Sequence, residues 1–104
     1  MEDETKEKKI PKYIEELNNG NIKITTKDGV FEIEDSPFEE LEKMRKRCKG
    51  EETKGLISLS IVSIDGVVKK VDEKDVGKLK SSTVAKIMQG TEVLYGVENI
   101  EELF

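Results

Sequence analysis

The sequence has no histidine, no tryptophan and a single cysteine, Cys48. A lone cysteine forms no internal disulfide, which favours a reducing compartment. Without histidine or a second cysteine, the usual zinc ligands are missing. Cys48 also lacks an imidazole that would activate it as a nucleophile. We therefore expect no metal site and no cofactor.

Long apolar runs are also missing. No segment approaches the roughly 20 apolar residues that cross a bilayer. Residues 1–9 are highly charged and no apolar segment follows them, so we expect neither a signal peptide nor a membrane partner. The expected location is the cytoplasm.

A basic excess is absent as well. The chain has 23 acidic and 18 basic residues and a net charge of −5. A nucleic-acid binder needs a clustered basic face that displaces counterions from phosphate. The balance of charge therefore predicts no nucleic-acid partner.

Motifs of catalysis are not found. The adjacent carboxylates 15–16, 39–40 and 101–102 would point about 100° apart on a helix, so they do not converge on one site. The sequence has no phosphate-binding glycine loop, no Ser/His/Asp set and no EF-hand loop. We expect a protein that is not an enzyme and that acts through surfaces binding other proteins.

What is present fits one small domain of 104 residues. Residues 1–9 mix both charge signs and predict a disordered tail. Residues 10–97 form the expected domain, and 98–104 an acidic C-terminal tail. The most apolar segment is 55–68, so we expect the core to form around it.

The N-terminal part of the domain predicts a short helix and then a hairpin. Helical spacing runs through Ile10, Tyr13, Ile14 and Leu17 until 18–20 stops it.

Residues 22–34 alternate as a β-hairpin, with Asp28-Gly29 in a two-residue type I′ turn. That turn pairs Thr26 with Phe31, Ile24 with Ile33, Lys23 with Glu34 and Thr25 with Glu32.

The next segment predicts a helix with a capping box. Ser36 is the expected N-cap, Pro37 the first helical residue and Glu39 the third. An apolar stripe follows, which consists of Phe38, Leu41, Met44 and Cys48. The helix is expected to stop at residue 50. The basic cluster Lys43, Arg45, Lys46, Arg47 and Lys49 falls in the last turns, where cations favour helix termination.

After a polar connector at 51–54, the segment 55–64 supports two interpretations. Alternation of Ile57, Leu59 and Ile61 with serines favours a strand. Val62 breaks the alternation, and a buried helix fits equally well. Asp65-Gly66 predicts a turn after it.

Two further helices are predicted near the C-terminus. Asp72 is the N-cap and Asp75 the acidic third residue of the first, with Val71 and Val76 as a hydrophobic staple. A longer helix over about 82–95 tolerates a glycine and stops at Gly96. The predicted fold class is therefore α+β: a mainly helical small single domain with an N-terminal β-hairpin.

This order of elements resembles the tail assembly chaperones of long-tailed viruses and prophages. The resemblance covers about residues 20–96. It rests on the hairpin at 22–34, the helix opening Ser36-Pro37-Phe38, the element 61–66, the acidic helix start at 71–75, Leu79, and the helix through 84–88.

The resemblance implies a mostly helical domain with a small β element and favours helix for 55–63. It also implies the activity: binding the tape-measure protein and recruiting tail-tube subunits to it, in the host cytoplasm. A helical groove suits an amphipathic helix, and negative charge keeps the loaded complex soluble. The apolar residues that we expect at the protein-binding surface are Met88, Leu94, Tyr95, Leu103 and Phe104.

Two other functions remain open from the sequence. A small acidic viral or plasmid-encoded inhibitor or regulatory protein would cluster its acidic side chains on one face, whereas Lys and Glu are interleaved here. A DNA-binding regulator would use the helix at 37–49 and bind less tightly as salt increases. Homo-oligomerisation is open in each case.

Overall fold

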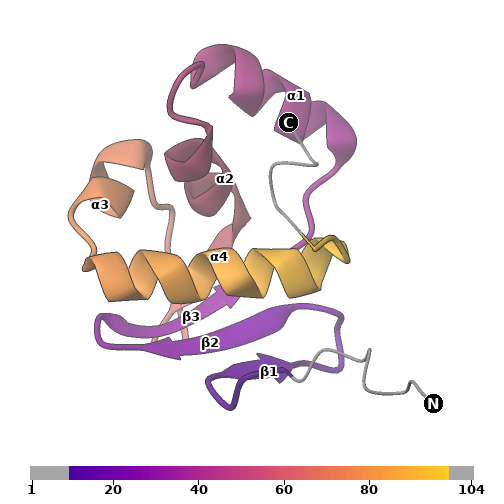
Figure 1. The fold of residues 1–104 in the computed structure, drawn as a ribbon, viewed down its shortest axis with the longest axis vertical. Coiled ribbons are helices and arrows are strands. Elements are labelled where there is room, and N and C mark those ends of the chain that lie inside the picture. Colours follow the sequence, from indigo (N-terminus) through magenta and orange to yellow (C-terminus); the bar gives the residue numbers. More distant parts are fainter. Residues whose placement is uncertain (1–9, 99–104) are drawn as a thin grey trace.

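The computed structural model describes residues 10–98, which fold as an antiparallel five-stranded sheet with helices on one face (Figure 1). The strands follow one another in space as along the chain. They are β1 (Ile14–Glu16), β2 (Ile22–Thr26), β3 (Gly29–Ile33), β4 (Ile61–Ile64) and β5 (Val67–Val68). The helices are α1 (Phe38–Arg47), α2 (Glu52–Ser60), α3 (Glu73–Gly77) and α4 (Ser81–Tyr95). The α+β fold class is confirmed. The predicted tail at 1–9 and most of the one at 98–104 lie outside the described residues.

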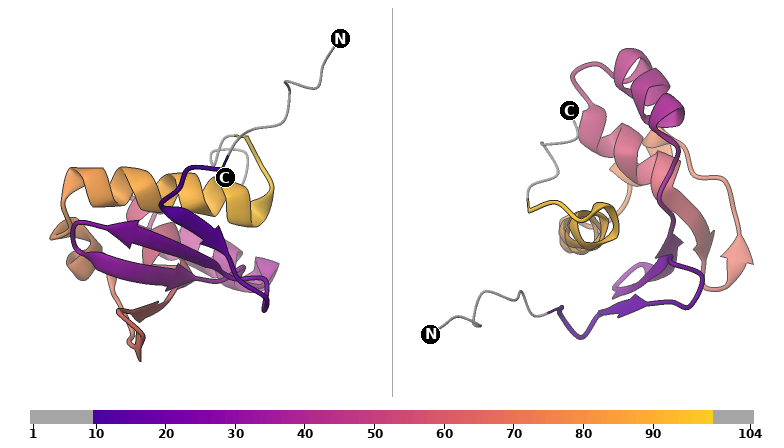
Figure 2. Two further views of the ribbon diagram at one scale, coloured as in Figure 1. Left: turned by 90° about the horizontal axis from the view of Figure 1, so that it is seen from below. Right: turned by 90° about the vertical axis from the view of Figure 1, so that its right-hand side faces the viewer.

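The helices gather on one side of the sheet. Helix α4 runs along the sheet over β2 and β3, and α1 and α2 form a helical hairpin inserted between β3 and β4 (Figures 1 and 2). Helix α2 packs against α1, α3 and α4. Over residues 10–98, no helix covers the opposite face of the sheet (Figure 2).

An apolar row crosses all five strands on the helical side. Ile14, Ile24, Phe31, Ile64 and Val67 are successive cross-strand partners. The first three are buried and Ile64 is half-buried, but Val67 is 64% exposed. Burying a large aliphatic or aromatic side chain contributes about 1.5–3 kcal/mol. The row therefore stabilises the sheet along most of its width and ends in an uncovered residue at β5.

The open side of the sheet carries a polar row. Glu15, Lys23, Glu32, Ser63 and Val68 are cross-strand partners there. Opposite charges stand next to each other on β1, β2 and β3, an arrangement that favours pairing. The valine again stands on the edge strand.

The core consists of two clusters that α4 joins. The first lies between the sheet and α4, and the second between α1 and α2. Met88 of α4 packs against both, so it ties the helical hairpin to the sheet layer. The first cluster comprises Ile14, Ile22, Ile24, Phe31, Ile33, Ile57, Ile61, Val71, Val76 and Ile87, and the second Leu41, Met44, Cys48 and Leu56.

The short helix predicted over 10–17 is wrong. Residues 14–16 are strand β1, in which Ile14 pairs with Ile24 and is buried. Four apolar residues at helical spacing are too short a segment to sustain a helix alone. The edge of β2 supplies partners for the backbone groups and an apolar surface for Ile14, so the strand is favoured.

The predicted hairpin forms, but its register and turn type are wrong. Ile24 pairs with Phe31 and Ile22 with Ile33, a shift of two residues that keeps every side chain on its predicted face. The Thr26 hydroxyl donates to the Gly29 carbonyl (2.8 Å) and accepts the Asp28 N–H (3.0 Å), which closes a different turn. Asp28 does not have the positive φ that a type I′ turn requires.

The positive φ angles of a type I′ turn occur instead at the second Asp-Gly pair. Asp65 has φ 53° and Gly66 φ 82°, and they join β4 to β5 with Ile64 paired to Val67. Asp65 is the one non-glycine residue with positive φ among the described residues. The turn predicted at 65–66 is therefore confirmed.

The predicted capping box of α1 is wrong. The helix begins at Phe38 after Pro37 with no side-chain cap, and the Pro37 carbonyl accepts the N–H groups of Glu40 and Leu41. Phe38 is 66% exposed, so it does not belong to the stripe. The other stripe residues, Leu41, Met44 and Cys48, are buried as predicted.

The helix interpretation of 55–64 is correct for residues 55–60, and the strand interpretation is correct for 61–64. Helix α2 runs to Ser60, and β4 starts at the next residue. The predicted connector at 51–54 is wrong for its last three residues, which open α2.

The capping box of α3 is confirmed, since Asp72 and Asp75 each accept the other's backbone N–H. Helix α4 starts one residue earlier than predicted and ends at Tyr95, where Gly96 with φ 71° is the C-cap as predicted.

Candidate protein-binding groove

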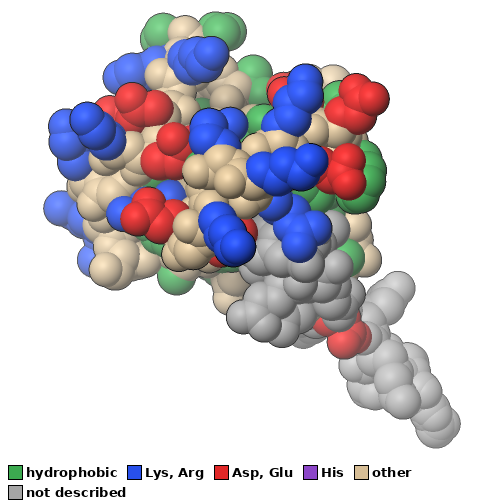
Figure 3. Space-filling model, turned by 90° about the horizontal axis from the view of Figure 1, so that it is seen from above, with side chains coloured by type: hydrophobic (Ala, Val, Ile, Leu, Met, Phe, Trp, Pro, Cys, Tyr) green, Lys and Arg blue, Asp and Glu red, His purple; other side chains and the backbone are tan. Residues whose placement is uncertain are grey.

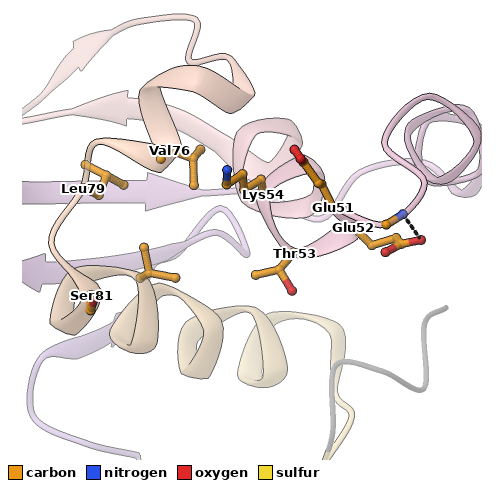
Figure 4. Close-up of a pocket in the computed structure, with 10 residues that line it drawn as sticks. Glu51, Glu52, Thr53, Lys54, Val76, Leu79 and Ser81 are labelled. Atoms are coloured by element: carbon orange, nitrogen blue, oxygen red, sulfur yellow. Dashed lines mark hydrogen bonds between the residues drawn. The ribbon is translucent and has the colours of Figure 1, made fainter.

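A groove of about 500 Å³ lies between α2, α3 and the first turns of α4 (Figure 4). We call it the α2–α4 groove. Figure 4 shows Thr53 reaching from α2 toward α4, with Val76 and Leu79 at the α3 end. The groove is lined by Gly50, Glu51, Glu52, Thr53, Lys54, Val76, Gly77, Leu79, Ser81 and Val84.

The floor of the groove is apolar and belongs to the core. Val76 is buried, and the half-buried Leu79 and Val84 pack against the first core cluster. Side chains held in a packed core lose little further freedom when a ligand binds. The floor therefore offers a preformed apolar surface.

The wall of the groove on α2 is polar. Glu51, Thr53 and Lys54 are exposed, and Glu52 is half-buried. The Glu52 carboxylate accepts the Gly50 N–H (3.1 Å), and this hydrogen bond lowers the pKa of Glu52. Glu52 is thus ionised at neutral pH and holds the α1–α2 loop in place beside the groove.

A three-residue network ties the elements around the groove together. The Glu73 carboxylate accepts from the Ser58 hydroxyl (2.8 Å) and from the Arg47 guanidinium (3.0 Å). These two donors, Ser58 first, lower the pKa of Glu73 because they stabilise its charged form. The network joins the start of α3 to α1 and α2, which fixes the position of the Val76 floor.

The other wall, the start of α4, is positioned from the sheet. The Asp28 carboxylate accepts the Lys80 N–H (2.9 Å), although Asp28 lies in the β2–β3 turn. This contact satisfies a backbone donor at the N-terminus of α4, where Lys80 supplies no side-chain cap. Ser81 and Val84 thereby keep a fixed place on the groove.

The residues predicted for binding lie elsewhere. Met88 is half-buried between both clusters, Leu94 packs on the first, and Tyr95 on the second. The Tyr95 hydroxyl lies 3.3 Å from the Ser60 hydroxyl. None of the three lines the α2–α4 groove, and Leu103 and Phe104 lie outside the described residues.

Sequence reasoning missed the apolar floor of the groove. Val76 was assigned to a helix staple, and Leu79 and Val84 to other elements. Val76 lies in α3, Leu79 in the loop after it and Val84 in α4, so the three give no periodic signal, and only the packing of α3 and α4 around α2 brings them together.

The basic cluster at the end of α1 is partly neutralised. Lys43 lies 3.8 Å from the Glu40 carboxylate, and Arg47 pairs with Glu73. Arg45, Lys46 and Lys49 share a shallow hollow with Glu42 and Glu52. Figure 3 shows both signs of charge interspersed over the side of the molecule that carries α1.

Two further observations concern metal binding and membrane crossing. Within residues 10–98, no three His, Cys, Asp or Glu side chains are grouped as metal ligands would be. Over the same range, no helix has the length and apolar character to cross a membrane.

No family model, curated protein or solved structure is significantly similar to this chain.

Proposed function

We propose that the chain is a non-enzymatic tail assembly chaperone of a long-tailed virus or prophage. It binds the tape-measure protein in the host cytoplasm and recruits tail-tube subunits to it. The observation that carries the proposal is the α2–α4 groove, which has an apolar floor and a polar wall. The proposed family is inferred from the order of elements that the sequence predicts.

The groove suits a helix of the tape-measure protein. An amphipathic helix docks through apolar side chains at i, i+3 or i+4, and i+7. The floor residues Val76, Leu79 and Val84 would receive such side chains, and Glu51 and Lys54 would meet the polar flank. Specificity then depends on both the apolar contacts and the charges of the wall.

The net charge of −5 supports the same role. A tape-measure chain exposes much apolar surface before the tail polymerises, and a carrier of high net charge keeps the complex dispersed. The DNA-binding alternative is less well supported, because Lys43 and Arg47 of the α1 cluster form ion pairs within the domain.

Co-expression with the product of the long apolar open reading frame that the proposal expects just downstream of this gene, the tape-measure protein, tests the proposal. We expect the tape-measure protein to stay soluble only when this chain is present, and the two to elute together in size exclusion. A tape-measure protein whose solubility is the same without this chain would contradict the proposal.

A matched pair of variants tests the groove itself. Ser81 and Ser82 are both exposed in the first turn of α4, but only Ser81 lines the groove. Ser81→Arg fills the groove and should lower the yield of soluble complex at least about fivefold, whereas Ser82→Arg should leave it unchanged. Equal effects of the two variants would place the binding surface elsewhere.

A further inference from the structure

The two edge strands of the sheet carry opposite charges. Strand β1 contains the exposed Glu15 and Glu16, and the exposed Lys69 and Lys70 follow directly after β5. Within residues 10–98, none of these four side chains forms an ion pair. Each edge therefore has unpaired charges that a partner of opposite sign can neutralise.

Strand β5 is also uncovered by apolar contacts. Val67 is 64% and Val68 83% exposed. Figure 2 shows the hairpin of β4 and β5 at one edge of the sheet, away from α4. Exposed β-branched residues on an edge strand form a template for a further strand, whereas lysines on an edge repel a strand that carries lysines itself. The edge therefore selects an acidic strand.

The backbone of β5 has unpaired groups that point outward. The Lys69 N–H donates to the Val62 carbonyl of β4 (3.3 Å). Because successive residues of a strand direct their N–H and C=O groups to opposite sides, those of Val68 and Lys70 point away from β4.

The backbone of β1 has unpaired groups on its outer side as well. The Leu17 N–H donates to the Asn21 carbonyl (2.9 Å), so the groups of Glu16 and Ile14 point away from β2. The Ile14 N–H already donates to the Pro11 carbonyl (3.0 Å). Strand β1 therefore offers the Ile14 carbonyl and both backbone groups of Glu16 to a partner.

We propose that β1 of one copy adds to β5 of a second copy and so continues the sheet from one molecule into the next. Within one copy the two strands cannot meet, because three strands lie between them and the edges are about 19 Å apart. Every neighbouring pair in the sheet is antiparallel, so β1 and β5 of one copy run in the same direction. A second copy in the same orientation brings its β1 parallel to β5.

One parallel register matches the outward groups of both strands. In this register Val68 lies beside Glu15. The Val68 N–H then donates to the Ile14 carbonyl, and the Val68 carbonyl accepts from the Glu16 N–H. The Lys70 N–H donates to the Glu16 carbonyl. The one group of Ile14 that Pro11 already occupies is the group that this register leaves unused.

The same register brings the charges together. Glu16 lies beside Lys69 on the side of the sheet that carries the helices. On the open side, Glu15 lies beside Val68 and diagonal to Lys70. Opposite charges on neighbouring strands stabilise a pair, and like charges destabilise it. The contact is therefore complementary in both its hydrogen bonds and its charges.

The contact joins two different surfaces of the chain. Each added copy leaves one β1 edge and one β5 edge free, so copies assemble head to tail into an open chain or a closed ring. Neither edge strand lines the α2–α4 groove. The inference is thus independent of the tape-measure proposal, and either one can fail without the other.

Sedimentation equilibrium of the full chain and of charge-reversed variants tests the inference. Between about 10 μM and about 1 mM, the wild-type chain should form dimers and larger species. The β1 reversal Glu15→Lys/Glu16→Lys should weaken this association at least about tenfold. The β5 reversal Lys69→Glu/Lys70→Glu should weaken it to a similar extent. A mixture of the two variants should restore the association, and so should one chain that carries all four substitutions.

A third double variant provides the matched control. Lys27→Glu/Lys46→Glu changes the net charge as the β5 reversal does, at two exposed lysines outside both edges. It should associate as the wild type does. Thermal unfolding of every variant verifies that it folds.

Four outcomes would overturn the proposal. They are a wild-type chain that stays monomeric over this range, an association that neither reversal weakens, one that only one reversal weakens, and a mixture that does not restore it. The first would mean that the lysines of β5 only protect the edge from pairing.

Disulfide cross-linking tests the register and does not depend on charge reversal. Under mild oxidation, a Glu16→Cys chain and a Lys69→Cys chain should form a linked heterodimer. Glu15→Cys should link to Lys69→Cys at least about tenfold more slowly, because residue 15 lies on the other side of the sheet. The wild-type chain is the blank, since Cys48 is buried. Equal rates for the two mixtures would overturn the register.

Discussion

The Asp28 carboxylate caps helix α4 across 52 residues of sequence, because it accepts the N–H of the N-cap residue Lys80 at 2.9 Å. The nearby Thr83 hydroxyl and this N–H lower the pKa of Asp28. Thr83 makes no hydrogen bond of ordinary geometry among the described residues. We therefore attribute its effect to the nearness of its dipole.

The first prediction concerns this cap. Asp28→Ala removes the acceptor and should lower the melting temperature by several degrees, whereas Asp28→Asn keeps an acceptor and should lower it less. Amide hydrogen exchange of Lys80 should become faster in the alanine variant. Equal melting temperatures for Asp28→Ala and the wild type would show that the cap does not contribute to stability.

The second prediction concerns stability in acid. The folded-state pKa of Glu73 lies below its ordinary value of 4.5. A lowered carboxyl pKa stabilises the folded chain fully above about pH 4.5, and this contribution is lost as the pH falls through the folded-state pKa.

Denaturant titrations of the wild type and of Glu73→Gln check the second prediction. The wild type should be the more stable near pH 7, and the difference should shrink below pH 4.5. Ser58→Ala should reduce the same difference, because Ser58 is the first cause of the lowered pKa. A difference independent of pH would assign the effect to packing.

The third prediction compares two helical glycines. A Cβ at Gly90 of α4 would collide with the side chain of Ile24, which is fully buried. Gly90→Ala should therefore lower the free energy of unfolding by about 1–3 kcal/mol. A Cβ at Gly77 would meet only Lys54 at 3.6 Å, so Gly77→Ala should be neutral or stabilise by up to about 1 kcal/mol. Urea titration of both variants measures the contrast.

The fourth prediction concerns Cys48. The residue is 8% exposed, and burial raises the pKa of its thiol. Since the thiolate is the reactive form, a disulfide reagent should react at least about tenfold more slowly with the native chain than with the chain in urea. Equal rates would mean that α1 opens faster than the reagent reacts.

Features that are determined by residues close together in the sequence were predicted correctly. Asp72 and Asp75 mark the start of α3, Gly96 marks the end of α4, and the alternation around Ile24 and Phe31 marks the hairpin. Each of these features depends on residues within a few positions, so a single sequence suffices to find it.

The errors fall where a distant partner decides the outcome. The type I′ turn was expected at Asp28, whose carboxylate is used instead to cap α4. Ile14 joins a strand because β2 offers an edge. The α2–α4 groove could not be predicted, since Val76 lies in α3, Leu79 in the following loop and Val84 in α4. The proposed family rests on the sequence, and the structure adds a surface on which to test it.

The position of α4 in the chain has a consequence for synthesis on the ribosome. Helix α4 is made last, yet it packs over β2 and β3, which are made early. Until residues 81–95 have emerged, Ile24 and Phe31 have no helix to cover them, so the nascent chain carries an open apolar face. The domain therefore completes its core only after residues 81–95 have emerged from the ribosome.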